Sequence, residues 1–520
     1  MLLNRQSLTP SRPRATKPGG TLLLALAAIV LLPGCNTLGP DFNRREPEAP
    51  AAWSDWHSAQ QAWDDPAIDT DNTPAAQWWR EFDDPVLNRL QQRLPEASPD
   101  LRSAMLNFSR SRLQRQLAAN VGVDIAANGG LSRQKLSEHG AQMRMAAISA
   151  PGNQDALISA LAKPYPLYQA GFDAGWEPDL WGRVSRTVES ADANTEASAA
   201  LLAQTRLALH AELARAYFEL RAQQRQIALL NAEIALSEAQ LALLEANRQA
   251  GLVSEMQLES LRQQLDEQRA ALPPLHSAAV ASENAIALML GEQPGALSEL
   301  LTADTSAEEE PEIQADLSLG LPSELARRRP DIRAAEARLH AATAEIGVAM
   351  ADLYPRVTLS AGFGFESFEQ GAFGDWASRR WSIGPGFYLP IFNQGRLKTR
   401  VELTRLAQQQ AAVAYQQTVL AAWQEVDNAL SGYSAERQRY RQLQRKLQSA
   451  QRRRQLSKAE VDAGLSDANI ELQAESQVLA IERQLAQSRA VLKIQRVAVY
   501  KAVGGGVEIQ NMQERKRSTE

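Results

Sequence analysis

The chain has 520 residues, which is too long for one ordinary compact domain and requires several domains or one very elongated architecture. Hydrophobic residues make up 44% of the chain and aromatic residues only 6%. Residues 184–290 and 396–500 are rich in Ala, Leu, Gln, Arg and Glu, which favours long helices. The net charge of −6 comes from interspersed acids and bases without a long basic tract, which argues against a nucleic-acid partner.

The N-terminal segment carries the only cysteine, Cys35. A basic stretch precedes an apolar run, 21–32, that is too short to cross a bilayer, and Leu32-Pro33-Gly34-Cys35 follows at once. This order resembles a lipoprotein signal peptide over residues 1–34, cleaved before a cysteine that then carries a covalent lipid. The alternative is a buried thiol in a short core helix. Asn36 replaces the Asp that favours inner-membrane retention, which points to the outer membrane.

Residues 35–80 are predicted to form a lipidated N-terminal arm in an extended conformation. Five tryptophans stand among Pro, Ala and Asp in this segment, and we expect their large apolar rings to anchor the arm. They are Trp53, Trp56, Trp63, Trp78 and Trp79.

Residues 81–291 and 322–506 carry the same unit twice, which identifies an architecture before any helix or strand is assigned. At an offset of 213 residues, Gly182-Arg183-Val184 matches Gly395-Arg396-Leu397, and Ala250-Gly251-Leu252 matches Ala463-Gly464-Leu465. An earlier segment, Pro99-Asp100-Leu101-Arg102, recurs as Pro330-Asp331-Ile332-Arg333 at an offset of 231. The connection between the two segments therefore differs in length by 18 residues.

In each unit a first helix is followed by two runs of about ten residues in which apolar side chains alternate with polar or small ones, as in a half-buried strand. A tilted strand of this length crosses a bilayer, although a soluble sandwich uses the same pattern. The lipid signal and the long helices favour the membrane, and four strands are too few to close a lumen, so a barrel needs several chains. The runs are 123–132, 168–177, 357–366 and 381–389.

Long helices follow in each unit, over about 184–290 and 396–503. The first stretch of each lacks proline. Apolar or aromatic residues recur in it every seven residues, which predicts coiled-coil packing. They are Leu213, Leu220, Ile227, Ile234 and Leu241 in the first unit and Val426, Tyr433, Tyr440 and Leu447 in the second. At each turn a glycine can adopt the left-handed conformation, and Ser254 or Asp467 can cap the returning helix. Pro273-Pro274 should interrupt and kink the first returning helix.

Two further segments look like accessories. Residues 292–321 contain Pro294, Glu308-Glu309-Glu310 and Pro311, and are predicted to be a solvated linker. Residues 507–520 form a polar tail that is expected to be disordered.

No local arrangement of nucleophile, base and metal ligands suggests catalysis, so we expect no enzyme activity, no metal and no cofactor besides the lipid on Cys35. His139 with Met143 and Met145, in the loop between the first two strands, is a weak candidate for a soft metal. A lipid-anchored coiled-coil scaffold and a secreted enzyme are the alternatives to a membrane duct.

Five motifs, in order along the chain, resemble those of TolC-like outer membrane efflux proteins of the lipoprotein, NodT-like branch. The resemblance implies a mainly α fold with β, internally duplicated: a trimeric transmembrane β-barrel of four strands per chain and a periplasmic barrel of coiled-coil helices. The motifs are Trp79-Arg80-Glu81-Phe82-Asp83-Asp84-Pro85, Trp176-Glu177-Pro178-Asp179-Leu180-Trp181-Gly182-Arg183, Arg328-Arg329-Pro330-Asp331-Ile332-Arg333-Ala334-Ala335-Glu336, Leu389-Pro390-Ile391-Phe392-Asn393-Gln394-Gly395-Arg396 and Tyr500-Lys501-Ala502-Val503-Gly504-Gly505-Gly506.

The resemblance also implies the function: a homotrimeric channel in the outer membrane, in contact with its lipid, that passively exports whatever an inner-membrane pump selects. A periplasmic adaptor (membrane fusion protein) would dock at the hairpin tips, and the pump would be of the RND or a related class. The residues that match the tip motif are Gly251, Leu252, Ser254, Gly464, Leu465 and Ser466.

A closed periplasmic end is expected, and many relatives constrict it with Asp in a Leu-Asp-Ala sequence. This chain has Leu472-Gln473-Ala474 instead, so other acids would have to form the gate. The candidates are Asp462, Asp467, Glu471 and Glu475, each of which also fits a solvated position on a helix surface.

Overall fold

The computed structural model describes residues 37–44, 68–69, 75–149, 152–302, 317–319 and 322–505. The predicted signal peptide, Cys35, three of the arm tryptophans, the acidic run at 308–310 and the tail 507–520 lie outside the described residues. The chain divides into two compact units. Of the described residues, the strand unit holds 37–40, 119–188 and 344–403, and the helix unit holds 41–118, 189–343 and 404–505.

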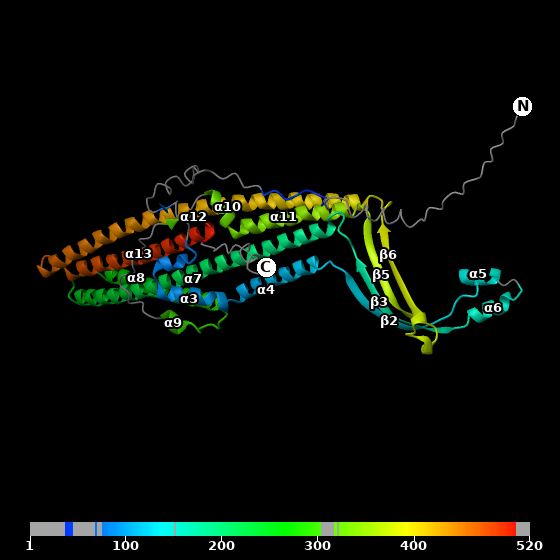
Figure 1. Cartoon of the computed structure of the whole chain (residues 1–520). Coiled ribbons are helices and arrows are strands. Elements are labelled where there is room, and N and C mark those ends of the chain that lie inside the picture. The colour runs from blue at the N-terminus through cyan, green and yellow to red at the C-terminus, as the bar shows by residue number, and fades with distance from the viewer. Residues whose placement is uncertain are drawn as a thin grey trace, which may run out of the picture. The chain divides into compact units, whose positions relative to one another are not determined.

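Four antiparallel strands form the sheet of the strand unit, in the order β2-β3-β5-β6 (Figure 1). Each strand end lies within three residues of the corresponding alternating run in the sequence. The strands are β2 (Asp124–Gln134), β3 (Tyr165–Trp176), β5 (Arg356–Ser367) and β6 (Arg379–Tyr388).

The two faces of this sheet differ in chemistry because directly opposite residues on neighbouring strands share a face. One row runs from Ala127 through Phe172 and Phe363 to Trp381, and the neighbouring row from Ile125 to Ile383 is also apolar. The rows of the other face contain Asn128, Asp173, Arg380 and several glycines. Phe172, Phe363 and Trp381 are exposed by 60%, 45% and 69%. An exposed apolar face on one side and a polar face on the other is the arrangement of a transmembrane barrel wall.

The connection from β2 to β3 contains two short helices, α5 (Ala141–Ser149) and α6 (Gln154–Leu161), where the sequence suggested only a loop. Met143 is buried and Met145 is 67% exposed, so the two sulfur ligands suggested for a soft metal have different surroundings. Two single turns, η4 (Gln370–Ala372) and η5 (Trp376–Ser378), connect β5 to β6.

The segment between β3 and the first long helix explains one of the five motifs. The guanidinium of Arg183 donates two hydrogen bonds of 3.0 Å to Glu177, and the indole Nε1 of Trp181 donates to the carbonyl of Pro355 at 2.7 Å. Asp179 accepts from the backbone N–H groups of Val184 and Ser185 and so caps the helix. These contacts of the motif residues turn the chain from a strand into a helix.

The long helices of the two units have equal lengths, as expected from the repeat in the sequence. Both α7 (Arg183–Gln249) and α12 (Arg396–Asp462) have 67 residues, and both α8 (Glu255–Met289) and α13 (Ala468–Ala502) have 35. In Figure 1, α8 returns beside α7 and α13 beside α12. Leu213, Leu220 and Val426 on the heptad positions are almost completely buried, as coiled-coil packing requires. The remaining helices are η3 (Trp78–Phe82), α3 (Pro85–Ala97), α4 (Pro99–Ala119), α9 (Ser298–Thr302), α10 (Pro322–Arg328) and α11 (Pro330–Ala351).

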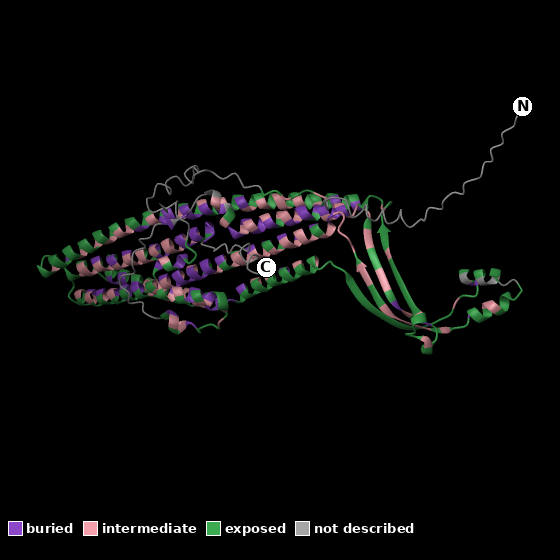
Figure 2. Cartoon of the chain, in the orientation of Figure 1, coloured by how far each residue is buried: buried purple, intermediate pink, exposed green. Residues whose placement is uncertain are grey.

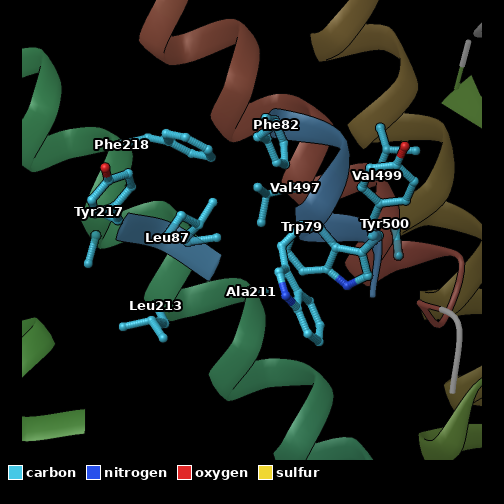
Figure 3. Close-up of a cluster of buried hydrophobic side chains, with 14 of the residues drawn as sticks. Trp79, Phe82, Leu87, Ala211, Leu213, Tyr217, Phe218, Val497, Val499 and Tyr500 are labelled. Atoms are coloured by element: carbon cyan, nitrogen blue, oxygen red, sulfur yellow. The ribbon is translucent and has the colours of Figure 1, made fainter. Parts of the chain in front are cut away.

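The core of the helix unit gathers apolar side chains from η3, α3, α7, α12 and α13. Trp78 stacks on Tyr500 with ring centroids 5.4 Å apart, and Phe82 lies 4.7 Å from Phe218. Trp78 and Trp79 therefore lie in the core, which agrees with their predicted role as anchors, but they belong to η3, so the predicted extended conformation is wrong at these two residues. Figure 3 shows part of this cluster, with Trp79, Phe82, Leu87, Ala211, Leu213, Tyr217, Phe218, Val497, Val499 and Tyr500 labelled.

The segment predicted to be a solvated linker contributes to the same core. Four of its leucines are each no more than 2% exposed: Leu297 just before α9, Leu301 within α9, and Leu317 and Leu319 near the end of the segment. The two-residue strand β4 (Leu317–Ser318) pairs in parallel with β1 (Ile68–Asp69). The leucines outweigh the Pro and Glu content of this segment because burying each side chain stabilises by about 1.5–3 kcal/mol.

The helix α8 runs through Pro273 and Pro274 without a break, so the predicted interruption is wrong, while the predicted kink stays a prediction. Each proline removes one backbone hydrogen bond from the helix interior. Leu272 and Leu275, on either side of the prolines, pack on the buried cluster of Leu230, Ile234 and Leu265. We attribute the unbroken helix to this packing against α7, because tertiary contacts override weak local propensity.

Candidate functional site: the hairpin tips

The two hairpins of the helix unit turn in the same way. Gly251 and Gly464 have φ angles of +78° and +72°, which an L side chain rarely adopts. The N–H of Leu252 donates to the carbonyl of Asn247 at 2.9 Å, and the N–H of Leu465 donates to that of Glu460 at 2.9 Å. This is the Schellman motif in both copies, and it satisfies the last carbonyls of each long helix.

The returning helices are capped by different residues. Ser254 and Gln257 form a capping box at the start of α8, in which each side chain accepts from the backbone N–H of the other. Asp467 caps α13, with its carboxylate accepting from the N–H of Asn469 at 3.2 Å. Ser466 donates its hydroxyl to Glu460 at 3.1 Å. The prediction that Ser254 and Asp467 are helix caps is confirmed.

An exposed leucine stands at the same position of each tip. Leu252 is 75% exposed and Leu465 is 79% exposed, and Met256 beside the first tip is 76% exposed. Below the first tip, Leu244, Leu258 and Leu261 form a small buried cluster that holds the turn in place. The Schellman turn needs the glycine but not an exposed leucine one residue later, so the leucines are available for contact with another surface.

The four candidate gate acids have different surroundings. Glu475 lies 3.0 Å from the guanidinium of Arg454 on the facing helix, and Asp467 caps α13. Asp462 is the exposed last residue of α12, and Glu471 is half-exposed in the first turn of α13. Among the contacts of the described residues, the carboxylates of Asp462 and Glu471 therefore neither cap a helix nor form an ion pair at the tip.

Two further groups were not predicted from the sequence. Glu233 of α7 is buried 3.2 Å from Arg483 of α13, so an ion pair connects the two hairpins, and burial raises the pKa of Glu233. On the polar face of the sheet, Glu366 accepts from Gln169 at 2.7 Å and lies 3.4 Å from Arg380. Only the alternation of polar residues in the strand runs could have located the second group, and nothing in the sequence pairs Glu233 with Arg483.

Among the described residues, no group of three or more His, Cys, Asp or Glu side chains is arranged to hold a metal ion. What the geometry does offer is two matching tips and a sheet with an apolar and a polar face.

Comparisons with known proteins agree over nearly the whole chain. The family model of the outer membrane efflux protein matches residues 90–292 and 321–505. Outer membrane protein OprJ of Pseudomonas aeruginosa is 30% identical over 495 residues, covering 94% of this chain and 96% of OprJ. The probable outer membrane lipoprotein SilC of Salmonella typhimurium is 26% identical over 492 residues, covering 93% and 98%. The solved structure of the outer-membrane channel OprN is 32% identical, with a TM-score of 0.76, and covers 90% of this chain and 99% of OprN.

A doubled coiled-coil hairpin, together with a four-stranded sheet that is apolar on one face, defines a TolC-like outer-membrane channel protein. The chain belongs to the outer membrane efflux protein family. It is the outer-membrane channel subunit of a tripartite efflux system, which conducts substrates passively from the periplasmic side to the cell exterior.

Proposed function

We propose that three copies of this chain form the working channel, with a lipid on each Cys35 and an adaptor docked at the hairpin tips. The observation that carries the proposal is the open edge on both β2 and β6. Unpaired N–H and C=O groups are too costly to leave in a bilayer, and four strands are too few to enclose a lumen. Closing the sheet with copies of itself solves both problems.

The lipid anchor is supported by the sequence that ends in Cys35 and by the likeness to SilC, whose name describes a probable outer membrane lipoprotein. One acyl-bearing cysteine per chain would hold the periplasmic arm at the membrane surface beside the barrel.

The docking of a periplasmic adaptor is supported by Leu252 and Leu465. They occupy the same place in two identical turns, and both are exposed. An adaptor would cover these apolar side chains, together with Gly251, Ser254, Gly464 and Ser466, and would link the channel to an inner-membrane pump of the RND or a related class. The pump would then choose the substrate and supply the energy.

The test replaces the two leucines and leaves the turns intact. In the double variant Leu252→Asp/Leu465→Asp, we expect cells to lose export by tenfold or more, measured as drug or dye accumulation, while the purified assembly keeps its size and ion conductance. The matched control is Leu252→Met/Leu465→Met, which keeps apolar side chains of similar volume and should export normally. Normal export by the aspartate variant would show that the hairpin tips are not part of the docking surface.

A further inference from the structure

The apolar face of the four-stranded sheet carries charge at one end only. The register assigns every residue of the strands to a face, because directly opposite residues on neighbouring strands share a face. The apolar face runs from Ile125 and Phe387 at one end to Arg133 and Arg379 at the other, and within the described strands these two arginines are its only charged residues. Arg133 is the second-last residue of β2, and Arg379 is the first residue of β6.

The charged end of this face is the end remote from the long helices. At the opposite end β2 and β5 follow α4 and α11, and β3 and β6 lead into α7 and α12. At the charged end the strands are connected through α5 and α6 and through η4 and η5. The helices of an outer membrane efflux protein extend into the periplasm, so the charged end of the sheet lies at the outer leaflet of the membrane.

An aromatic side chain positions Arg379. The guanidinium lies over the ring of Trp376, 4.4 Å from its centroid, and Nη1 donates to the Trp376 carbonyl at 2.5 Å. Trp376 is 69% exposed, and nearby the rings of Phe373 and Tyr168 have centroids 6.1 Å apart. Exposed aromatic rings at the end of an apolar strand face are typical of the boundary between hydrocarbon and headgroups. Arg379 therefore lies at the level of the lipid headgroups.

The neighbouring Arg380 shows how the two faces differ. It belongs to the polar face, where its guanidinium lies 3.4 Å from the carboxylate of Glu366. Arg379 and Arg133 are exposed, and no carboxylate in the described part of the chain forms an ion pair with either of them. Both stand on the edge strands β2 and β6, which are exposed along almost their whole length (Figure 2). An anionic partner for these two arginines must therefore come from outside the described chain.

We propose that Arg379 and Arg133 bind the phosphate groups of the anionic glycolipid of the outer leaflet, lipopolysaccharide. A guanidinium binds a phosphate through two parallel hydrogen bonds. In this lipid the phosphates are attached to the sugars from which the acyl chains extend, so its charge lies at the boundary where the two arginines stand. The acyl chains would then cover Trp381 and Ile383, which are 69% and 67% exposed on the same face. The inference depends on the outer-membrane location of the chain, and not on the number of copies or on an adaptor.

Binding of lipid A, the phosphorylated acyl-sugar part of lipopolysaccharide, tests the site. Full-length wild type and variants are purified in detergent, and the Kd for lipid A with two phosphates is measured by native mass spectrometry. We expect the Kd of Arg133→Gln/Arg379→Gln to rise by about tenfold or more, because both phosphate-binding groups are lost while side chains of similar polarity remain.

The matched control is Arg380→Gln, which removes one guanidinium a single position away on the polar face. Its Kd should stay within about twofold of the wild type, because its partner is Glu366 and not the lipid. The single variant Arg379→Gln carries the same change in charge, and its Kd should rise by about threefold or more.

Two further lipids identify what is recognised. Lipid A from which both phosphates have been removed should bind the wild type as weakly as intact lipid A binds the double variant. Phosphatidylglycerol, which has one phosphate and no acylated sugar, should bind at least about tenfold more weakly than lipid A. Equal binding of the dephosphorylated lipid would exclude phosphate recognition, and equal binding of phosphatidylglycerol would exclude the assignment to the glycolipid.

A double variant that binds lipid A as the wild type does would overturn the proposal, as would equal losses of affinity in Arg379→Gln and Arg380→Gln. Unchanged mobility on a gel before heating shows that a variant is still assembled. Should the double variant not assemble, the comparison of Arg379→Gln with Arg380→Gln decides the question alone.

Discussion

Asp467 caps a helix and is also a candidate gate residue, and a test must separate these two roles. Its carboxylate caps α13, whereas Glu471 lies one turn further and caps nothing among the described contacts. Asparagine is as good a helix cap as aspartate, so Asp467→Asn removes the charge and keeps the turn.

We expect the double variant Asp467→Asn/Glu471→Gln to conduct ions several-fold better than the wild type in a planar bilayer. If these carboxylates form the constriction, removing their charges removes the interactions that keep the tips closed. The control is Glu259→Gln in the first hairpin, which removes one carboxylate outside the candidate gate and loses only an exposed ion pair with Arg262. An unchanged conductance in the double variant would exclude these two acids as the constriction.

His210 is a buried histidine in the core of the helix unit. Its ring stacks on Trp79 at 4.4 Å, its Nδ1 faces the amide oxygen of Gln91, and the Gln91 amide donates to the His210 carbonyl at 2.8 Å. Burial first, and then the charge of Arg206, lower the pKa of His210 to about 4. The folded protein therefore keeps this imidazole neutral at pH values where an unfolded chain protonates it.

This difference predicts acid sensitivity. Since the folded pKa lies below the unfolded value of about 6.5, stability is complete above pH 6.5 and is lost as the pH falls toward 4. Between pH 7 and pH 5 the free energy of unfolding should fall by roughly 2 kcal/mol through this residue alone. Thermal unfolding in detergent measures it. The variant His210→Phe keeps a ring against Trp79, and its stability should depend less on pH. An equal pH dependence in the variant and the wild type would show that other groups cause the acid sensitivity.

At the scale of elements, the doubled proline in α8 shows packing overriding local preference. The helix continues because Leu272 and Leu275 pack against α7, but the carbonyls of Arg269 and Ala270 lose the donors that a continuous helix would supply. The equivalent helix α13 has no proline.

Replacing both prolines should therefore stabilise the first hairpin. We expect Pro273→Ala/Pro274→Ala to raise the free energy of unfolding by roughly 1–3 kcal/mol, because two backbone hydrogen bonds return without loss of the leucine contacts. Hydrogen exchange of the amides around 269–278 should slow correspondingly. A destabilised variant would mean that α8 needs the prolines to follow the surface of α7.

The elements that sequence reasoning found are those with a long period or a strict alternation. Heptads such as Leu213 and Leu220, and runs such as that ending at Trp176, repeat often enough for position alone to indicate a face. The elements that it missed depend on distant contacts: Trp78 is in the core because Tyr500 lies against it, and Leu317 because β1 pairs beside it. Local composition, rich in Pro and acids, suggested an extended arm and a solvated linker.

The candidate site was predicted to a similar extent. The turns at Gly251 and Gly464 and the caps at Ser254 and Asp467 follow from residue chemistry within a few positions. The pairing of Glu475 with Arg454, and of Glu233 with Arg483, depends on which helix faces which and has no local signal.

On the scale of the whole molecule, the four strands with two open edges are the part of the chain that one copy cannot complete. The apolar face fits lipid, the polar face fits a water-filled lumen, and the edges fit other copies of the chain. A protein of this kind works only as a closed assembly, so conduction and assembly belong together.

The most direct test is the ion conductance of the purified wild-type assembly in a planar bilayer. The account predicts discrete conductance steps from protein that runs as a trimer before heating and as single chains afterwards. Folded, assembled protein that enters the bilayer and leaves its conductance unchanged would contradict the account.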